Sequence, residues 1–144
     1  MKVLYAASFG GHWVQLNRIA KGLSFSDEVF ISTKSVKSED KVYIIKDFNV
    51  SNFYIGFSEF LKVYRIIKEE DPAWVLSTGA APGLLVIFLA SIVGKKTMWV
   101  DSIANSKKLS LSGKLAMYFA DITLSQWEDV AAKNKKVEYI GSLL

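Results

Sequence analysis

The order of hydrophobic and polar positions along the chain predicts alternating strands and helices. Short apolar runs bounded by turn residues indicate strands, and apolar positions spaced three or four apart indicate helices. We expect strands at residues 2–8, 27–32, 42–45, 73–76, 96–100, 122–125 and 137–140. We expect helices at residues 13–22, 52–70, 82–94 and 112–120, and a short one that opens at 126–128. This alternation favours an α/β fold, a doubly wound and mostly parallel sheet with right-handed crossovers.

The longest predicted helix, residues 52–70, carries an aromatic stripe on one face. The stripe consists of Phe53, Phe57, Phe60, Tyr64 and Ile67. The polar positions expected on the opposite face are Ser58, Glu59, Lys62, Arg65 and Glu69. We expect the stripe to pack in the core. The alternative is that part of it meets a membrane or a partner helix. Ser51 or Asn52 is expected to cap this helix, and Pro72 ends it.

Composition limits the chemistry and the partners of the protein. The 144 residues contain no cysteine and one histidine, which excludes disulfides and thiolate metal sites and argues against a histidine-based zinc site. We therefore predict neither a metal nor a cofactor. The net charge of +4 suits an anionic membrane surface or a phosphorylated substrate, but not nucleic acid, which needs a denser basic stripe. No linker or repeat divides the chain, so we predict one domain at residues 1–144.

The chain is apolar for a water-exposed domain, with 51% hydrophobic residues and a mean hydropathy of +0.22. Residues 73–94 carry no charge, but turn residues divide them into a strand and a helix. Neither part reaches the roughly 20 residues that a membrane span requires. No signal peptide is apparent. The apolar excess indicates that lipid, a partner protein or both cover part of the surface.

Candidate chemistry begins at the first strand–helix junction, Gly10-Gly11-His12. Unpaired N–H groups at the start of a helix favour an anion, so the junction is a candidate phosphate site. The alternative is a tight turn that needs glycine for its geometry alone. His12 is either a general base or a solvated or helix-capping histidine. The spacing matches neither the dinucleotide fingerprint nor the P-loop.

Two further junctions end at the same edge of the predicted sheet. Residues 77–81 bring small residues and two hydroxyl groups to a helix start, where Ser77 or Thr78 is either a binding residue or an ordinary cap. Asp101 and Ser102 follow the strand at 96–100. A carboxylate at the carboxyl end of a parallel strand is positioned for substrate chemistry, although Asp101 could also cap the next helix.

Several segments, taken in order, resemble one known family. They are residues 7–16, 77–81, 109–114, 120–121, 126–128 and 141–144. The family is the membrane-side subunit of the split UDP-N-acetylglucosamine transferase of asparagine-linked glycosylation, with bacterial counterparts in exopolysaccharide and capsule synthesis. The resemblance covers essentially the whole chain.

The resemblance implies a Rossmann-like domain equivalent to the N-terminal half of a GT-B glycosyltransferase. This half binds a polyprenyl-diphosphate-linked acceptor at the membrane, and a separate partner chain binds the UDP-sugar. A hexosyltransferase of this kind is active only as the heterodimer. The implied catalytic residues are His12 and, second to it, Asp101. The implied acceptor and phosphate residues are Gly10, Gly11, Thr78, Gly79 and Ser102, and the implied partner-contact residues are Trp127, Glu128, Leu143 and Leu144.

The chain departs from the family pattern after the strand at 96–100. The family usually has Glu-Ser followed shortly by Arg, whereas this chain has Asp101-Ser102 followed by Asn105. The missing guanidinium removes a bidentate phosphate contact, so either Lys107 or Lys108 replaces it or the acceptor differs. The N-terminal anchor of eukaryotic members is not seen here, which favours a bacterial, peripheral protein on the cytoplasmic face of the membrane.

Two alternatives to the enzyme subunit follow from the same residues. The chain could be a non-catalytic membrane recruiter that activates a self-sufficient glycosyltransferase. It could also be a stand-alone nucleotide-binding domain. The incomplete glycine pattern, and the lack of an acidic residue after the second strand, argue against the nucleotide-binding domain.

Overall fold

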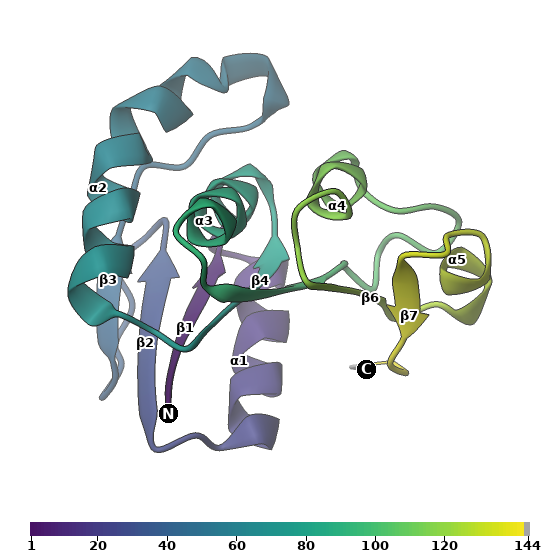
Figure 1. The fold of residues 1–144 in the computed structure, drawn as a ribbon, viewed down its shortest axis with the longest axis horizontal. Helices are drawn as coiled ribbons and strands as arrows, with labels where there is room; N and C mark the ends of the chain where they lie inside the picture. The colour runs from purple at the N-terminus through teal and green to yellow at the C-terminus, as the bar shows by residue number, and fades with distance from the viewer. Residues whose placement is uncertain (143–144) are drawn as a thin grey trace.

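The computed structural model describes residues 1–142 as a seven-stranded parallel sheet in the order β3-β2-β1-β4-β5-β6-β7 (Figure 1). The strands are β1 (Lys2–Ala7), β2 (Asp27–Ser32), β3 (Lys41–Ile44), β4 (Trp74–Gly79), β5 (Lys96–Val100), β6 (Ile122–Ser125) and β7 (Val137–Tyr139). The helices are α1 (Gly11–Leu23), the 3-10 turn η1 (Val50–Asn52), α2 (Tyr54–Glu70), α3 (Ala81–Ile92), α4 (Leu111–Ala116) and α5 (Glu128–Ala132). The predicted α/β class with a doubly wound parallel sheet is therefore confirmed.

The central strand β1 separates two hydrophobic cores. Leu4 and Ala6 pack with buried residues of α2 and α3, whereas Val3 and Tyr5 pack with α1. Figure 1 shows α3 and α4 on one side of the sheet and α1 on the other. Successive side chains of a strand point to opposite faces, so a strand covered on both sides reads as a continuous apolar run. This arrangement explains why β1 has no polar alternation.

The uncharged stretch at residues 73–94 forms β4 and α3, as predicted. Neither Ser77 nor Thr78 caps α3, because its N-cap residue is Ala80, which makes no side-chain capping bond. The capping alternative for these two residues is therefore wrong. Gly94 follows the helix with a φ of 81°, as expected for a residue that ends a helix. Among residues 1–142, no helix combines the length and the apolarity needed to cross a membrane.

The prediction that the aromatic stripe of α2 packs in the core is wrong except at Ile67. The other four members are exposed, and Phe57 is 70% exposed. The buried face of α2 is formed instead by Gly56, Glu59, Val63, Ile66, Ile67 and Glu70. Successive residues of a helix are about 100° apart around its axis. The aromatic face and the face one residue away from it therefore both have helical spacing in the sequence. The branched aliphatic residues of the latter face fill the space over the sheet, which leaves the rings outside.

Two further details of this region differ from the prediction. Glu59, expected on the exposed face, is 6% exposed. Neither Ser51 nor Asn52 is the cap. The side chain of Asn49 instead accepts hydrogen bonds from the backbone N–H groups of Ser51 and Asn52, at 3.0 and 3.1 Å. The cap thus stabilises η1 and not α2 itself.

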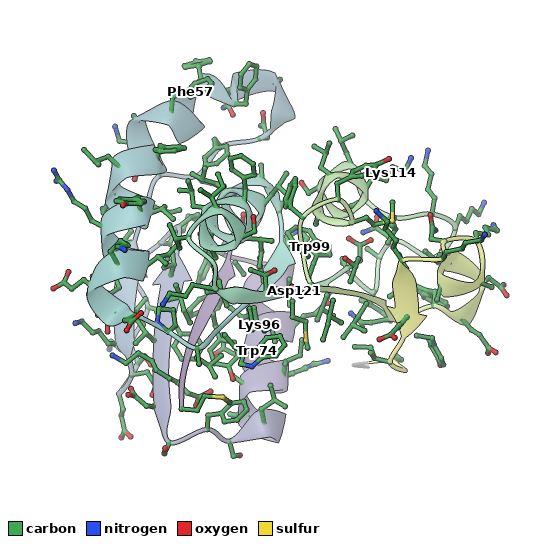
Figure 2. The ribbon with its side chains drawn as sticks, in the orientation of Figure 1. Phe57, Trp74, Lys96, Trp99, Lys114 and Asp121 are labelled. Atoms are coloured by element: carbon green, nitrogen blue, oxygen red, sulfur yellow. The ribbon has the colours of Figure 1, made fainter. Side chains whose placement is uncertain are left out.

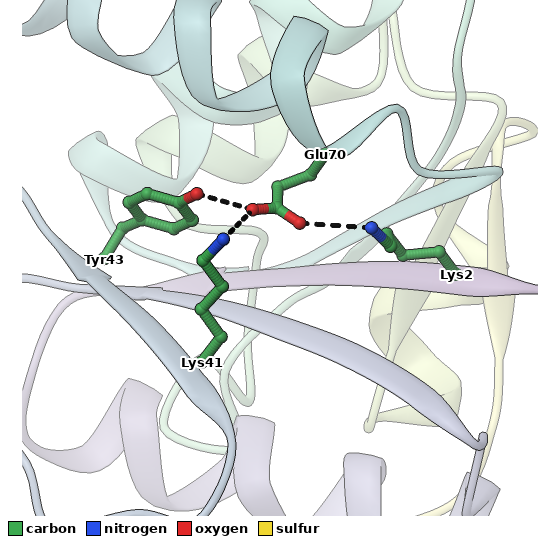
Figure 3. Close-up of polar contacts among 4 residues, drawn as sticks. All are labelled: Lys2, Lys41, Tyr43 and Glu70. Atoms are coloured by element: carbon green, nitrogen blue, oxygen red, sulfur yellow. Dashed lines mark hydrogen bonds and ion pairs between the residues drawn. The ribbon is translucent and has the colours of Figure 1, made fainter.

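The carboxyl end of α2 is tied to the sheet by a cluster of charged groups around Glu70 (Figure 3). Its carboxylate pairs with the ammonium of Lys2 at 3.1 Å and with that of Lys41 at 2.7 Å, and it accepts a hydrogen bond from the Tyr43 hydroxyl. The hydrogen bonds from Lys41, Tyr43 and Lys2 lower the pKa of Glu70 from 4.5 to about 2. Glu70 is thus a buried anion with three partners at the amino edge of the sheet.

Candidate functional site

A polar pocket of about 260 Å³ lies at the carboxyl edge of the sheet, where β4 and β5 end beside the start of α1. Its lining consists of His12, Gly79, Ala80, Trp99, Ser102, Ala104, Asn105, Ser110, Leu111 and Ser112. Three predicted site residues therefore share one pocket: His12, Gly79 and Ser102. Gly11, Thr78 and Asp101 adjoin lining residues in the chain, and Gly10 is two residues from His12, but all four are outside the lining itself.

His12 is held in one orientation by two hydrogen bonds to Thr78. Its Nδ1 lies 2.9 Å from the Thr78 carbonyl oxygen, and the Thr78 hydroxyl donates to the His12 carbonyl at 2.6 Å. A carbonyl oxygen can only accept, so Nδ1 carries the hydrogen and Nε2 is the basic nitrogen of the neutral ring. The N-cap of α1 is Gly10, so the ring does not cap the helix. The arrangement suits a group that takes up a proton at Nε2.

Gly79 makes room for the imidazole. Its φ is 118°, and a Cβ there would approach His12 Nδ1 to 2.8 Å. The backbone around it links β1 to β4, because Ser8 N–H donates to the Gly79 carbonyl at 2.9 Å and Ala80 N–H donates to the Ser8 hydroxyl at 3.2 Å. The glycine is thus a steric requirement of the His12 position.

Asp101 does not line the polar pocket. Its side chain accepts hydrogen bonds from Trp99 Nε1, from Ser110 N–H and from the Ser110 hydroxyl, at 3.1, 2.9 and 2.6 Å. The residue is 2% exposed, and a Cβ on Gly113 would come within 2.6 Å of its Oδ1. Ser110, in turn, is the N-cap of α4. Because both carboxylate oxygens are engaged, this geometry favours a positioning role over the predicted role as a base.

Two buried amide side chains join α1 to the ends of β5 and β6. Gln126 Nε2 donates to Gln15 Oε1 at 2.7 Å and to the Asp101 carbonyl at 3.1 Å. Gln15 Nε2 donates to the Ser102 hydroxyl at 3.3 Å, and Gln15 Oε1 accepts from Ile103 N–H at 3.3 Å. The sequence interpretation missed Gln15. Its spacing of three residues from His12 was the available signal, since both lie on one face of α1.

The loop after β2 also reaches this edge. Phe9 N–H donates to the Thr33 hydroxyl at 2.9 Å, and the ammonium of Lys34 lies 5.6 Å from the centre of the Phe9 ring. The first residues of this loop thus bring a cation beside Phe9, the residue before the Gly10-Gly11 turn.

Some of the residues predicted to replace the family's arginine or to contact the partner lie near the pocket, and others do not. Asn105 lines it, whereas Lys107 and Lys108 are exposed and outside its lining. Trp127 Nε1 donates to the Ile103 carbonyl at 2.6 Å, so Trp127 supports the pocket wall from behind. The other partner-contact residues are Glu128, which is exposed, and Leu143 and Leu144, which lie outside the described residues.

An apolar groove of about 390 Å³ runs beside the polar pocket, between α2, α3 and α4. Its apolar lining includes Phe53 at the N-cap of α2, Phe57 and Phe60 of α2, Leu84, Leu85 and Phe88 of α3, Leu111 and Leu115 of α4, and Phe48 and Phe119. Leu111 and Ser112 line both cavities. In residues 1–142, no group of three or more His, Asp or Glu side chains is arranged to hold a metal ion.

The fold of the whole chain resembles one half of larger solved proteins. It matches MurG of Acinetobacter baumannii with a TM-score of 0.79 and 14% identity, over 99% of this chain and 46% of MurG. It matches the lipopolysaccharide outer core galactosyltransferase WaaB with a TM-score of 0.65 and 12% identity, over 100% of this chain and 46% of WaaB. At such identities the likeness concerns the fold alone. The chain is an α/β domain of the kind that forms half of a GT-B enzyme.

Sequence comparison gives the family. A family model described as "Oligosaccharide biosynthesis protein Alg14 like" matches residues 44–143, and the chain therefore belongs to the Alg14 family. The UDP-N-acetylglucosamine transferase subunit ALG14 of Candida albicans is 34% identical over 123 residues, which cover 77% of this chain and 56% of that protein. The subunit of the same name from Schizosaccharomyces pombe is 51% identical over 59 residues, 40% of this chain and 28% of that protein.

The family resemblance noted in the sequence is thus confirmed. The chain spans only 28% and 56% of the length of these two relatives. Both relatives are fungal, and the bacterial origin stays a prediction.

Proposed function

We propose that this chain is the acceptor-binding, membrane-associated subunit of a two-chain glycosyltransferase. A partner chain would supply the UDP-sugar site, and the acceptor would be a polyprenyl-diphosphate-linked saccharide. The names of the relatives, which are subunits of a UDP-N-acetylglucosamine transferase, support a divided enzyme. The observation that carries the proposal is the polar pocket with an oriented histidine beside a large apolar groove, since an acceptor of this class has a polar and an apolar part.

The diphosphate of the acceptor would meet the amino end of α1. The first N–H groups of a helix have no acceptor within the helix and carry positive partial charge, which favours phosphate oxygens. Gly10 and Gly11 leave this helix start open to solvent, and Lys34 adds a full positive charge near it. Gly79 lines the neighbouring wall, and Thr78 holds His12 beside it. Together these groups suit the oxygens of a phosphate.

The transfer itself needs a base for the acceptor hydroxyl. The hydroxyl oxygen forms a bond to the anomeric carbon, the bond from that carbon to the UDP oxygen breaks, and UDP leaves with the electron pair. The hydroxyl proton passes to Nε2 of His12, whose Nδ1–H stays bonded to Thr78. Asp101 acts in this scheme as a positioning residue that fixes the Ser110 cap and the pocket wall.

Membrane association would use the aromatic stripe of α2. Phe57 projects at the amino end of α2, away from the sheet (Figure 2), and Tyr54 beside it is 67% exposed. On α2, Leu61 is 53% exposed; just beyond α4, Tyr118 is 73% exposed, and Lys114, four residues earlier, is exposed as well. Exposed aromatic and leucine side chains with nearby lysines are typical of a surface that inserts shallowly into an anionic bilayer.

The test is an assay of the chain, a candidate UDP-sugar-binding partner, and the mixture, with UDP-N-acetylglucosamine and a prenyl-diphosphate-linked acceptor on vesicles. We expect transfer only in the mixture. Full transfer by the partner alone would refute the catalytic role of this chain and leave the recruiter as its function. Vesicle sedimentation of the chain measures membrane association separately.

A further inference from the structure

We propose that the apolar groove binds the phosphate-proximal isoprene units of the acceptor, as a subsite distinct from the membrane contact. This inference rests on the proposed function and specifies which part of the acceptor the chain recognises. It assigns an occupant to the cavity between α2, α3 and α4.

The chemistry of the groove selects an uncharged, branched hydrocarbon. Leu84, Leu85 and Phe119 are half-buried along it, and Phe60 and Leu115 stand on its two sides. No charged side chain lines it within the described residues. A peptide in such a groove would bury backbone N–H and C=O groups with almost no partners, which costs free energy, whereas an isoprenoid has no such groups. The volume of about 390 Å³ is within the range of about 300–1,000 Å³ that is usual for small-ligand pockets.

The groove and the polar pocket adjoin each other, which indicates the direction of the ligand. Leu111 and Ser112, the first residues of α4, line both cavities. At the start of α3, Ala80 lines the polar pocket and Ala81 lines the groove. A diphosphate held near His12 and Gly79 therefore has the groove as the adjacent apolar space for the chain that it carries.

The groove shares Phe53, Phe57 and Phe60 with the surface proposed to touch the membrane, but each also has residues of its own. Tyr54, Leu61 and Tyr118 are exposed and lie outside its lining, whereas Leu84 and Leu85 line it and are half-buried. A substitution within the groove can therefore reduce prenyl binding while the exposed rings remain. If the groove served only as a membrane contact, the chain would show no preference among soluble diphosphates with prenyl chains of different length.

The experiment is calorimetric titration of the full chain, without membranes, with inorganic pyrophosphate and with dimethylallyl, geranyl and farnesyl diphosphates. We expect the affinity to rise at each added isoprene unit, by at least tenfold from pyrophosphate to farnesyl diphosphate. Leu115→Trp, which narrows the groove, should remove most of this gain and leave pyrophosphate binding unchanged. Leu23→Trp is the matched control, because Leu23 is 47% exposed against 45% for Leu115 and lies at the far end of α1. It should behave as wild type.

The outcomes separate this inference from the proposed function. Pyrophosphate binding with no gain from the prenyl chain would overturn the inference and leave the diphosphate site standing. Binding of neither ligand would overturn both. Equal loss of prenyl binding in Leu23→Trp and Leu115→Trp would show a non-specific apolar effect and also overturn the inference. In vesicle sedimentation, Leu115→Trp should match wild type. A loss there with an intact prenyl gain would assign the groove to bulk lipid.

Discussion

The two ends of α2 lie at opposite edges of the sheet and differ in what their side chains do. At the amino end, Phe53, Tyr54 and Phe57 are exposed next to the apolar groove. At the carboxyl end, Ile67 is buried and Glu70 is held by three partners (Figure 3). One helix therefore carries two different features. Its amino end has apolar rings whose exposure to water costs free energy, and its carboxyl end has a polar network that stabilises the fold. We infer that ligand recognition is confined to the carboxyl edge and that the amino edge serves stability.

The largest expected effect is at the carboxyl edge. His12→Ala should lower turnover of the two-chain enzyme by about 10²–10⁴-fold, because the acceptor hydroxyl loses its base. The lost 2.9 Å bond to Thr78 should also cost about 1 kcal/mol of stability, so turnover is measured per folded complex. Lys21→Ala, on an exposed position in the last turn of α1, is the control. Unchanged turnover in His12→Ala would remove the histidine from the mechanism.

The next effect breaks the network at the amino edge. Glu70→Gln should lower the free energy of unfolding by about 1–3 kcal/mol, since it removes a carboxylate that two ammonium groups face in a buried position. Turnover per folded molecule should not change. Urea unfolding measures the effect, with Glu69→Gln on the neighbouring exposed residue as the control. A loss of turnover without a loss of stability would contradict the division between the two edges.

A smaller effect is expected from the exposed end of α2. Phe57→Ser should lower the affinity for anionic vesicles, measured by sedimentation, by about tenfold. This change corresponds to the free energy of partly burying one phenylalanine ring. The melting temperature should not fall, because the ring is 70% exposed. Tyr139→Ser removes a ring that is 50% exposed on β7 and should leave vesicle binding unchanged. A marked fall in melting temperature for Phe57→Ser would restore the core role that the sequence pattern suggested.

The sheet could be predicted from the sequence because the signal for each strand lies within a few neighbouring residues. Each strand is a short apolar run, and handed crossovers then leave few topologies. The sequence did not suffice for α2, because the stripe of Phe53 and Phe57 and the face of Val63 and Ile66 both have helical spacing. Only the space above the sheet decides which one is buried. The more hydrophobic face of a helix is therefore a poor guide to which face is buried when a ligand or lipid also needs apolar side chains.

The same limit applies to the site. His12, Gly79 and Ser102 were predicted together because the carboxyl ends of parallel strands meet at one edge. The direction of the Asp101 carboxylate was not predictable, since it depends on Ser110 nine residues later in the chain. The contact between Gln15 and Gln126 spans 111 positions and has no local signature. Chain spacing identifies which residues reach an edge, and packing decides where each side chain points.

The smallest expected effect sharpens the comparison through pH. The pKa of Glu70 falls from 4.5 to about 2 on folding, mainly through its hydrogen bonds to Lys41 and Tyr43, so between these values the unfolded chain binds the proton that the folded chain does not. The stability difference between wild type and Glu70→Gln should be constant from pH 7 to about pH 5 and shrink as the pH falls from about 4.5 toward 2. Lys95 also lowers the pKa of Asp71, but Asp71 is present in both proteins and cancels in the difference. Urea midpoints at half-unit pH intervals measure the curve. A difference that persists unchanged at pH 3 would mean that packing of the Glu70 side chain, and not its charge, anchors the carboxyl end of α2.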